Sequence, residues 1–108
     1  MHIFVIVTNF AHISEMQRAA RVDSNQKELV KQIRGLNYSV LIVSQLKNCF
    51  DILVGAKGKN YAFEIKDPEK PPSKRRLTEG EQRFFDNWKG QVNIALTIDD
   101  VLNVINND

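Results

Sequence analysis

The chain has 108 residues, of which 43% are hydrophobic and 26% are charged, a composition typical of one globular domain with no room for a second core. The single cysteine excludes an internal disulfide, and no cysteine and histidine residues lie at zinc-finger spacing. A net charge of +2 is compatible with a nucleic-acid partner but does not demand one.

The first ten residues are apolar except at His2, Thr8 and Asn9, and no basic residue precedes them. A secretory signal needs a basic start and a longer apolar run, and this segment is too short to span a bilayer. We therefore expect residues 1–15 to form an accessory strand or an extension, and residues 16–108 to form a single domain. The expected location is cytoplasmic, with no membrane partner.

A helix is predicted from Asp23 to Arg34. Asp23 or Ser24 would cap its first turn, and Gly35 would end it. Glu28 lies at the border of the apolar stripe, which consists of Leu29, Val30, Ile33 and Leu36.

Three strands are predicted next. Residues 38–43 are rich in β-branched and large apolar side chains, which indicates a strand buried on both faces. Residues 51–54 run into the glycine-containing turn of residues 55–59, which is typical of a β-hairpin. In residues 61–66, Tyr61, Phe63 and Ile65 alternate with Ala62, Glu64 and Lys66.

Prolines at positions 68, 71 and 72 interrupt regular structure, and a second helix is predicted from Glu79 to Lys89. Thr78 and Glu81 have the spacing of a capping box. The aromatic residues of this helix recur at helical spacing, and we interpret them as core residues: Phe84, Phe85 and Trp88.

A strand over residues 92–96 and a short helix that begins at Asp99 or Asp100 complete the chain. The order is helix, three strands, helix, strand and helix. This order predicts an α/β fold in which helices flank a mixed sheet.

The hairpin would bring Asp51 beside Glu64 and Lys66, and the last two must project from the same face of their strand. Two carboxylates with an ammonium group beside them suit metal-assisted phosphodiester hydrolysis, because carboxylate oxygens bind hard divalent cations such as Mg²⁺. The same charges on the wet face of a half-buried strand would form only a weak surface pair, and the charge pattern alone leaves that alternative open.

Asp51 followed about a dozen residues later by Glu64-Ile65-Lys66, with a preceding helix that carries Glu28, resembles the PD-(D/E)XK nuclease superfamily. The chain is most similar to small phage-type VRR-NUC and Holliday-junction-resolvase-like members, in four stretches: residues 21–26, 51–55, 64–67 and 70–78. The resemblance covers about residues 16–105 and implies a restriction-endonuclease-like αβββαβ core. Phe50 replaces the proline of the family motif.

The resemblance implies that Asp51 and Glu64 bind Mg²⁺ or Mn²⁺ together with the main-chain carbonyl of Ile65, and that Lys66 is the catalytic lysine. It also implies that Glu28 completes the site and that Gln82 lies near it. An exposed helix position is the alternative for both of these residues.

Residues 70–76 contain four positive charges and no negative one, at Lys70, Lys74, Arg75 and Arg76. We expect these residues to bind phosphates, with a solvated loop as the alternative. The predicted function is a metal-dependent endonuclease that acts on DNA, with branched or flapped DNA as candidate substrates, and a homodimer is expected because the core is small. A catalytically silent nucleic-acid-binding or interaction module and an RNA-directed nuclease remain open alternatives.

Overall fold

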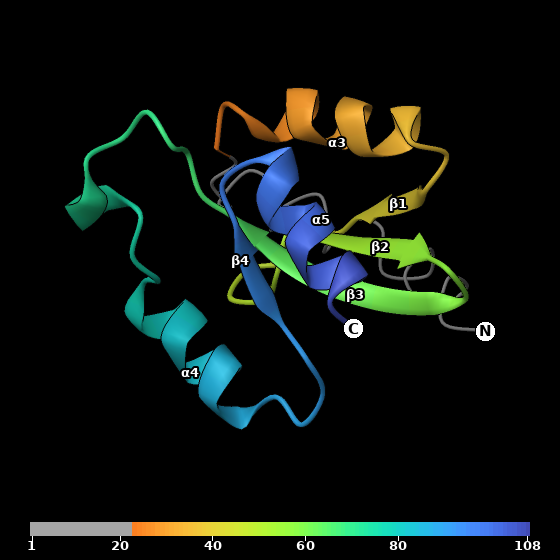
Figure 1. Cartoon of the computed structure of the whole chain (residues 1–108). Coiled ribbons are helices and arrows are strands. Elements are labelled where there is room, and N and C mark those ends of the chain that lie inside the picture. The colour runs from red at the N-terminus through yellow and green to blue at the C-terminus, as the bar shows by residue number, and fades with distance from the viewer. Residues whose placement is uncertain (1–22) are drawn as a thin grey trace.

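The computed structural model describes residues 23–108, which form an α/β fold with a four-stranded mixed sheet and three α-helices (Figure 1). The accessory strand or extension predicted for residues 1–15 lies outside the described residues. The elements follow one another as α3 (Gln26–Gly35), β1 (Ser39–Ile42), β2 (Ile52–Ala56), β3 (Lys59–Ile65), the 3₁₀ turn η1 (Pro72–Lys74), α4 (Glu79–Asn87), β4 (Asn93–Ala95) and α5 (Ile98–Asn106).

The sheet has the strand order β1-β2-β3-β4. The first three strands are antiparallel, and β4 pairs parallel to β3 with Phe63 opposite Asn93. The β2–β3 hairpin turns through Lys57 and Gly58, whose positive φ angles of 56° and 76° match the twist of a two-residue hairpin loop. The predicted hairpin is therefore confirmed.

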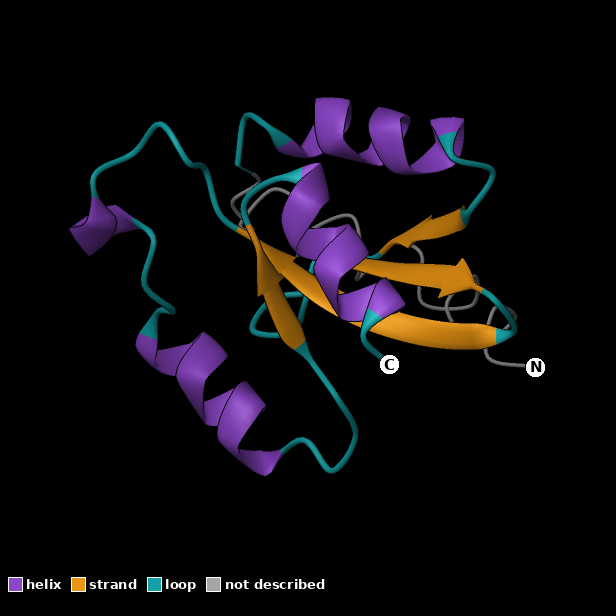
Figure 2. Ribbon diagram, viewed as in Figure 1, coloured by secondary structure: helices purple, strands orange, loops and turns teal. Residues whose placement is uncertain are grey.

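The core lies between one face of the sheet and the helices α3 and α5, which Figure 2 shows on the same side of the strands. The apolar stripe of α3 supplies three buried residues, and α5 supplies two. The largest fully buried side chains come from all these elements: Tyr61, Phe63, Ile33, Ile52, Ile65, Ile105, Val54 and Val101. Burial of this apolar surface is the main stabilising contribution to the fold.

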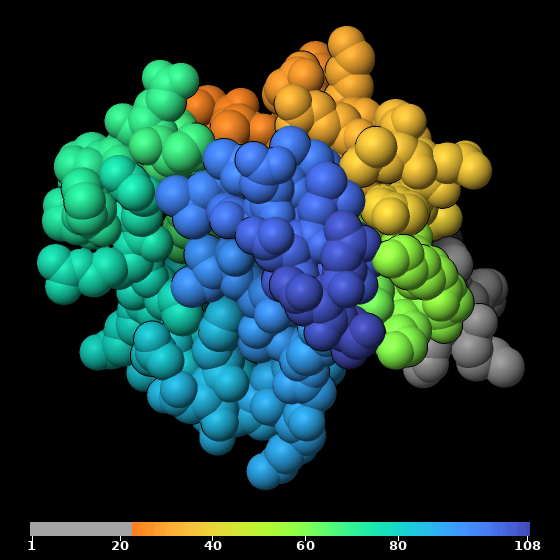
Figure 3. Space-filling model, viewed as in Figure 1, coloured from red at the N-terminus to blue at the C-terminus, as the bar shows by residue number. Residues whose placement is uncertain are grey.

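Two predicted burial patterns were wrong. Strand β1 was expected to be buried on both faces, but it is the outer strand of the sheet that residues 23–108 form, and three of its four residues are exposed. Helix α4 was expected to place its aromatic residues in the core, but it contains no buried residue, and Trp88 directly after it is 46% exposed. Helix α4 and the segment with η1 instead cover one side of the molecule (Figure 3).

Within residues 23–108, no helix is long and apolar enough to cross a membrane.

Candidate functional site

The β2–β3 hairpin brings Asp51 and Glu64 together at the end of the sheet. Ile52 pairs with Phe63, and the ladder continues with a hydrogen bond from the Asp51 N–H to the Phe63 carbonyl at 2.9 Å. The Ile65 N–H donates to Asp51 Oδ2 at 2.7 Å. Phe63 and Ile65 belong to the core, so the alternation of the strand points Glu64 to the opposite face.

Both carboxyl groups are buried, with only 9% of Asp51 and 5% of Glu64 exposed. Burial raises the pKa of Glu64 to about 9, and the neighbouring charges of Asp51 and Glu81 act in the same direction. Burial also raises the pKa of Asp51 to about 6, although the hydrogen bond from Ile65 opposes this shift. The folded chain therefore concentrates carboxyl groups in a place where their negative charge is poorly compensated.

Lys66 contributes a buried ammonium group to the same cluster. Its Nζ lies 2.8 Å from Glu81 Oε1 and 3.5 Å from Glu64 Oε2. Burial by itself would lower the pKa of Lys66, but the ion pairs with the two glutamates outweigh it and the pKa is raised. Lys66 is therefore held in its charged form beside the carboxylates.

Glu81 is a site residue that the sequence analysis assigned only to helix capping. The capping box of α4 is present as predicted: the Glu81 N–H donates to Thr78 Oγ1, and the Thr78 N–H donates to Glu81 Oε1. The same Oε1 accepts the hydrogen bond from Lys66. Burial would raise the pKa of Glu81, but the hydrogen bonds from Lys66 and Thr78 and the positive charge of Lys66 together outweigh it, and the pKa is lowered. The first turn of α4 thus fixes the lysine ammonium.

A hollow of about 240 Å³ opens onto this cluster. Asp51, Glu64 and Glu81 line it together with residues of the loop between β1 and β2, which include Phe50. Gly80 permits the close approach of α4 to this loop, because a Cβ atom there would lie 2.3 Å from Asn48 Oδ1. The hollow is large enough for a phosphate group and its water molecules, and three carboxyl-bearing side chains line it.

Gln26 at the start of α3 also reaches this region, which the sequence analysis did not predict. It is 5% exposed, and its Nε2 donates to the hydroxyl of Ser44, a residue that lines the hollow. Within residues 23–108 its Oε1 has no hydrogen-bond partner. The signal in the sequence was its position at the first turn of the helix, where a polar side chain can point back toward the sheet.

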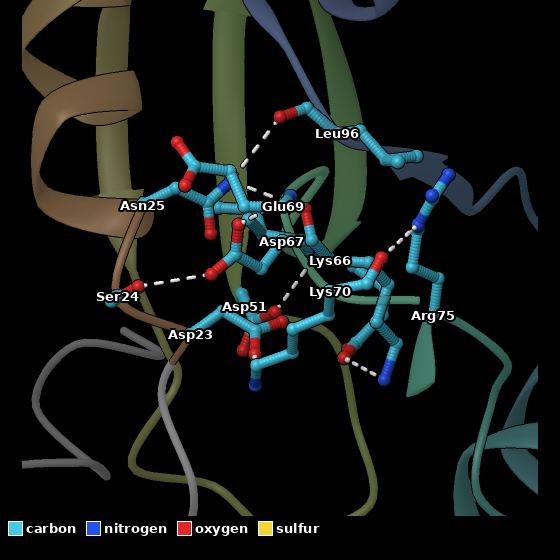
Figure 4. A network of polar contacts seen from close by, with 12 residues as sticks. Asp23, Ser24, Asn25, Asp51, Lys66, Asp67, Glu69, Lys70, Arg75 and Leu96 are labelled. Carbon is cyan, nitrogen blue, oxygen red and sulfur yellow. Dashed lines mark hydrogen bonds and ion pairs between the residues drawn. The ribbon is translucent and has the colours of Figure 1, made fainter. Parts of the chain in front are cut away.

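The polar residues that precede α3 connect the helix to the end of β3, as Figure 4 shows. The Asn25 amide nitrogen donates to the main-chain carbonyls of Lys66 and Leu96, at 3.1 and 3.2 Å. Ser24 donates to Asp67 Oδ2 at 3.0 Å. Asn25 is the N-cap residue of α3 but makes no side-chain capping bond. Ser24 was one of the two residues expected to cap the helix, but Ser24 and Asn25 instead hold the end of the strand that carries Glu64.

Two predicted site residues lie elsewhere. Glu28 is exposed on α3 and lines hollows beside that helix, not the one above Asp51. Gln82 is exposed on α4, and its Nε2 donates to Asp86 at 2.9 Å. Its neighbour Glu81 points toward Lys66 in its place.

The basic loop, residues 70–76, follows shortly after Lys66. Lys70 forms an ion pair with Asp23 at 2.8 Å, and Arg75 Nε donates to the Lys70 carbonyl at 2.7 Å, which folds the loop back on itself. Lys74 and Arg76 are exposed and line a second hollow, which shares Thr78 with the hollow above the carboxylates. Two of the four predicted phosphate-binding residues therefore brace the loop, and two face solvent next to the site.

Cys49 also lines the hollow, but burial raises the pKa of its thiol, which disfavours the reactive thiolate. Within the described residues, no group of three or more histidine, cysteine, aspartate or glutamate side chains is arranged to hold a metal ion. The ligand set implied by the sequence resemblance contains only two such side chains, Asp51 and Glu64, with a main-chain carbonyl as the third ligand.

Comparison with known proteins found no matching family model and no significant match among curated proteins or solved structures.

Proposed function

We propose that this chain is a metal-dependent endonuclease that hydrolyses phosphodiester bonds in DNA. The observation that carries this proposal is the buried pair of Asp51 and Glu64, which line an open hollow, together with the Lys66 ammonium 3.5 Å from Glu64. A purely structural ion pair would have no need of the second, uncompensated carboxylate, because burying an unpaired charge is unfavourable. Active sites are where such perturbed groups gather.

The charges of the cluster fit a divalent cation. Three carboxylates (Asp51, Glu64 and Glu81) and one ammonium group (Lys66) give a net formal charge of −2 when all are ionised. Oxygen ligands of this kind suit Mg²⁺ and Mn²⁺. Asp51 and Glu64 would hold the ion, with the carbonyl of Ile65 beside them. A bound divalent cation would polarise the scissile phosphate and supply a nucleophilic hydroxide near neutral pH.

The remaining residues of the site have separate roles. Lys66 donates a proton in a hydrogen bond to a phosphate oxygen or to the attacking water, and its positive charge offsets the negative charge that develops in the transition state. Glu81 holds the Lys66 ammonium at 2.8 Å, so the group is already oriented before DNA binds. Lys74 and Arg76 are exposed at the neighbouring hollow, where they bind the phosphate backbone.

The order of the described elements supports assignment to the PD-(D/E)XK superfamily. A helix, three antiparallel strands, a helix and a parallel strand follow one another as in its αβββαβ core. The candidate ligands also lie at the expected places, with Asp51 immediately before β2 and Glu64 near the end of β3.

The test is cleavage of single-stranded, duplex, flapped and four-way-junction DNA by purified protein with Mg²⁺ or Mn²⁺. We expect cleavage that a chelator abolishes, and we expect Glu64→Gln and Lys66→Ala each to reduce the rate to background while circular dichroism remains native. Glu28→Gln is the matched control, since its carboxylate is exposed outside the hollow, and we expect it to cleave as the wild type does.

Full activity in either site variant would overturn the assignment of the site. Binding of DNA without cleavage under every metal tested would instead identify a silent binding module. Preferential cleavage of RNA in a parallel assay would mean that RNA, and not DNA, is the substrate.

A further inference from the structure

Three aromatic rings form a cluster between α4 and the loop before β2. Phe84 and Trp88 are stacked, with ring centroids 5.2 Å apart and an interplanar angle of 23°. Phe50 packs against both, with centroid distances of 6.1 Å and 6.5 Å. Trp88 nevertheless remains 46% exposed, which is unusual for a ring that is already packed on one side. The cluster presents an indole to solvent instead of burying it.

The cluster is continuous with the candidate site. Phe50 directly precedes Asp51 and lines the same hollow as Asp51, Glu64 and Glu81. The edge of the indole is also left open by Gly90, because a Cβ atom there would lie 3.0 Å from Trp88 Nε1. A strand whose phosphate lies over the carboxylates would therefore have a base within reach of these rings.

Several positively charged residues accompany the hollow and the aromatic cluster. Lys47 lines the hollow, and Lys89 follows Trp88 in the chain; both are exposed. Lys74 and Arg76 line the neighbouring hollow that shares Thr78 with the first. Exposed aromatic rings next to basic side chains are the combination that binds single-stranded nucleic acid, because any base can stack on a ring while lysine and arginine hold the backbone.

We propose that Trp88 is a stacking platform for an unpaired base of the DNA strand that crosses the candidate site. The proposal extends the nuclease function proposed above, since it specifies that the DNA next to the cleaved bond is single-stranded or unpaired. A fully paired duplex would offer Trp88 no free base, so the platform selects the frayed or branched part of a substrate. Trp88 touches the bound strand but takes no part in bond cleavage.

The chain has one tryptophan, so its fluorescence reports on this platform alone. The experiment titrates the full-length protein with oligothymidylate of about 10 nucleotides, in chelator so that no cleavage occurs. We expect the Trp88 emission to be quenched on binding, and we expect quenching by a blunt duplex of the same length to be much weaker. Fluorescence anisotropy of a labelled oligonucleotide measures the affinity independently.

Two substitutions of Trp88 separate stacking from folding. Trp88→Ala should weaken binding of the oligonucleotide about 10-fold or more, because the stacking surface is lost. Trp88→Phe should retain most of the affinity, since a smaller ring still stacks. Leu36→Ala is the matched control, because Leu36 is also 46% exposed but lies at the end of α3, and its loss should leave binding unchanged.

Binding without quenching, or equal affinity of Trp88→Ala and wild type, would overturn the proposal. So would a change of sedimentation coefficient in Trp88→Ala with unaltered affinity, which would assign the rings to a protein interface. These outcomes are independent of catalysis. If binding depends on Trp88 but no metal supports cleavage, the stacking platform is retained and the nuclease function is rejected. If cleavage is sensitive to chelator but binding does not depend on Trp88, the nuclease function is retained and the stacking platform is rejected.

Discussion

Glu64 is buried, and the negative charges of two neighbouring carboxylates disfavour its ionised form. In the unfolded chain its carboxyl has its ordinary pKa of 4.5, whereas burial and the charges of Asp51 and Glu81 raise the pKa in the folded chain to about 9. Between these values the folded state retains a proton that the unfolded state has released. The free energy of unfolding is therefore unaffected by this group below pH 4.5 and decreases as the pH rises toward 9.

Glu64→Gln should consequently stabilise the metal-free protein at alkaline pH. We expect the variant to melt at a higher temperature than the wild type near pH 8 in chelator, and the difference to disappear near pH 4, where the wild-type carboxyl is protonated. Thermal melting followed by circular dichroism checks this. Glu79→Gln removes an exposed carboxylate and should show no such pH-dependent gain. A lower melting temperature for Glu64→Gln at pH 8 would contradict the raised pKa.

Glu81 has two structural roles that one substitution tests together. Its Oε1 accepts hydrogen bonds from both the Thr78 N–H and the Lys66 ammonium. Glu81→Gln should lower the free energy of unfolding by about 1 kcal/mol through the capping box. It should also slow DNA cleavage roughly 10- to 100-fold, because the lysine loses its orienting partner. Glu79→Gln, two residues earlier on the same helix, should change neither; cleavage at the wild-type rate in Glu81→Gln would remove Glu81 from the site.

The basic loop contains two residues that stabilise its conformation and two that are exposed to solvent. Lys70 and Arg75 hold the loop in place, whereas Lys74 and Arg76 are exposed at a hollow beside the site. Lys74→Ala combined with Arg76→Ala should weaken DNA binding for every sequence and reduce the slope of log affinity against log salt by about 2, one for each phosphate contact removed. The salt dependence of anisotropy titrations measures this slope.

The matched control for the loop is Lys27→Ala combined with Lys31→Ala on α3. It removes the same charge from exposed positions that line a different hollow. We expect it to leave the slope unchanged. An equal decrease in both double variants would mean that the loop acts only through net charge.

The elements that the sequence predicted well are those whose signals are local. Three of them are the hairpin turn predicted within residues 55–59, the capping box at Thr78 and the apolar stripe of α3. Each depends on neighbours within a few residues. The buried strand predicted at residues 38–43 failed because its place at the edge of the sheet depends on how distant strands pair. Its apolar composition is the same in either position.

The candidate site was predictable where the hairpin alone brings residues together. Asp51, Glu64 and Lys66 meet because the register of β2 and β3 places them so. Glu81 was missed in favour of Gln82 because adjacent helix residues differ by about 100° in direction, and only packing decides which one faces the strand. Gln26 was missed because its burial against Ser44 joins two elements across a loop.

Binding of a metal should be coupled to folding of the whole chain. A cation that binds only the folded site raises the free energy of unfolding as its concentration increases. We therefore expect Mn²⁺ or Mg²⁺ to raise the melting temperature of the wild type, and we expect this increase to vanish in Asp51→Asn and Glu64→Gln. Differential scanning fluorimetry over a metal titration measures it.

Asp99→Asn is the control for the metal titration, because Asp99 is exposed in the first turn of α5 and belongs to no hollow of the site. It should respond to metal as the wild type does. An unchanged metal response in Glu64→Gln would place the bound ions elsewhere on the protein. The homodimer expected from the small core stays a prediction, to be measured by sedimentation in the same buffers.

The shared oxygen of Glu81 has a consequence for how this protein can change over evolution. Replacement of Lys66 leaves a half-buried carboxylate without its cation, and replacement of Thr78 loosens the helix that carries that carboxylate. A substitution at Lys66 or at Thr78 alone is therefore unfavourable. Among natural variants of this chain, positions 66, 78 and 81 should therefore change together and not singly.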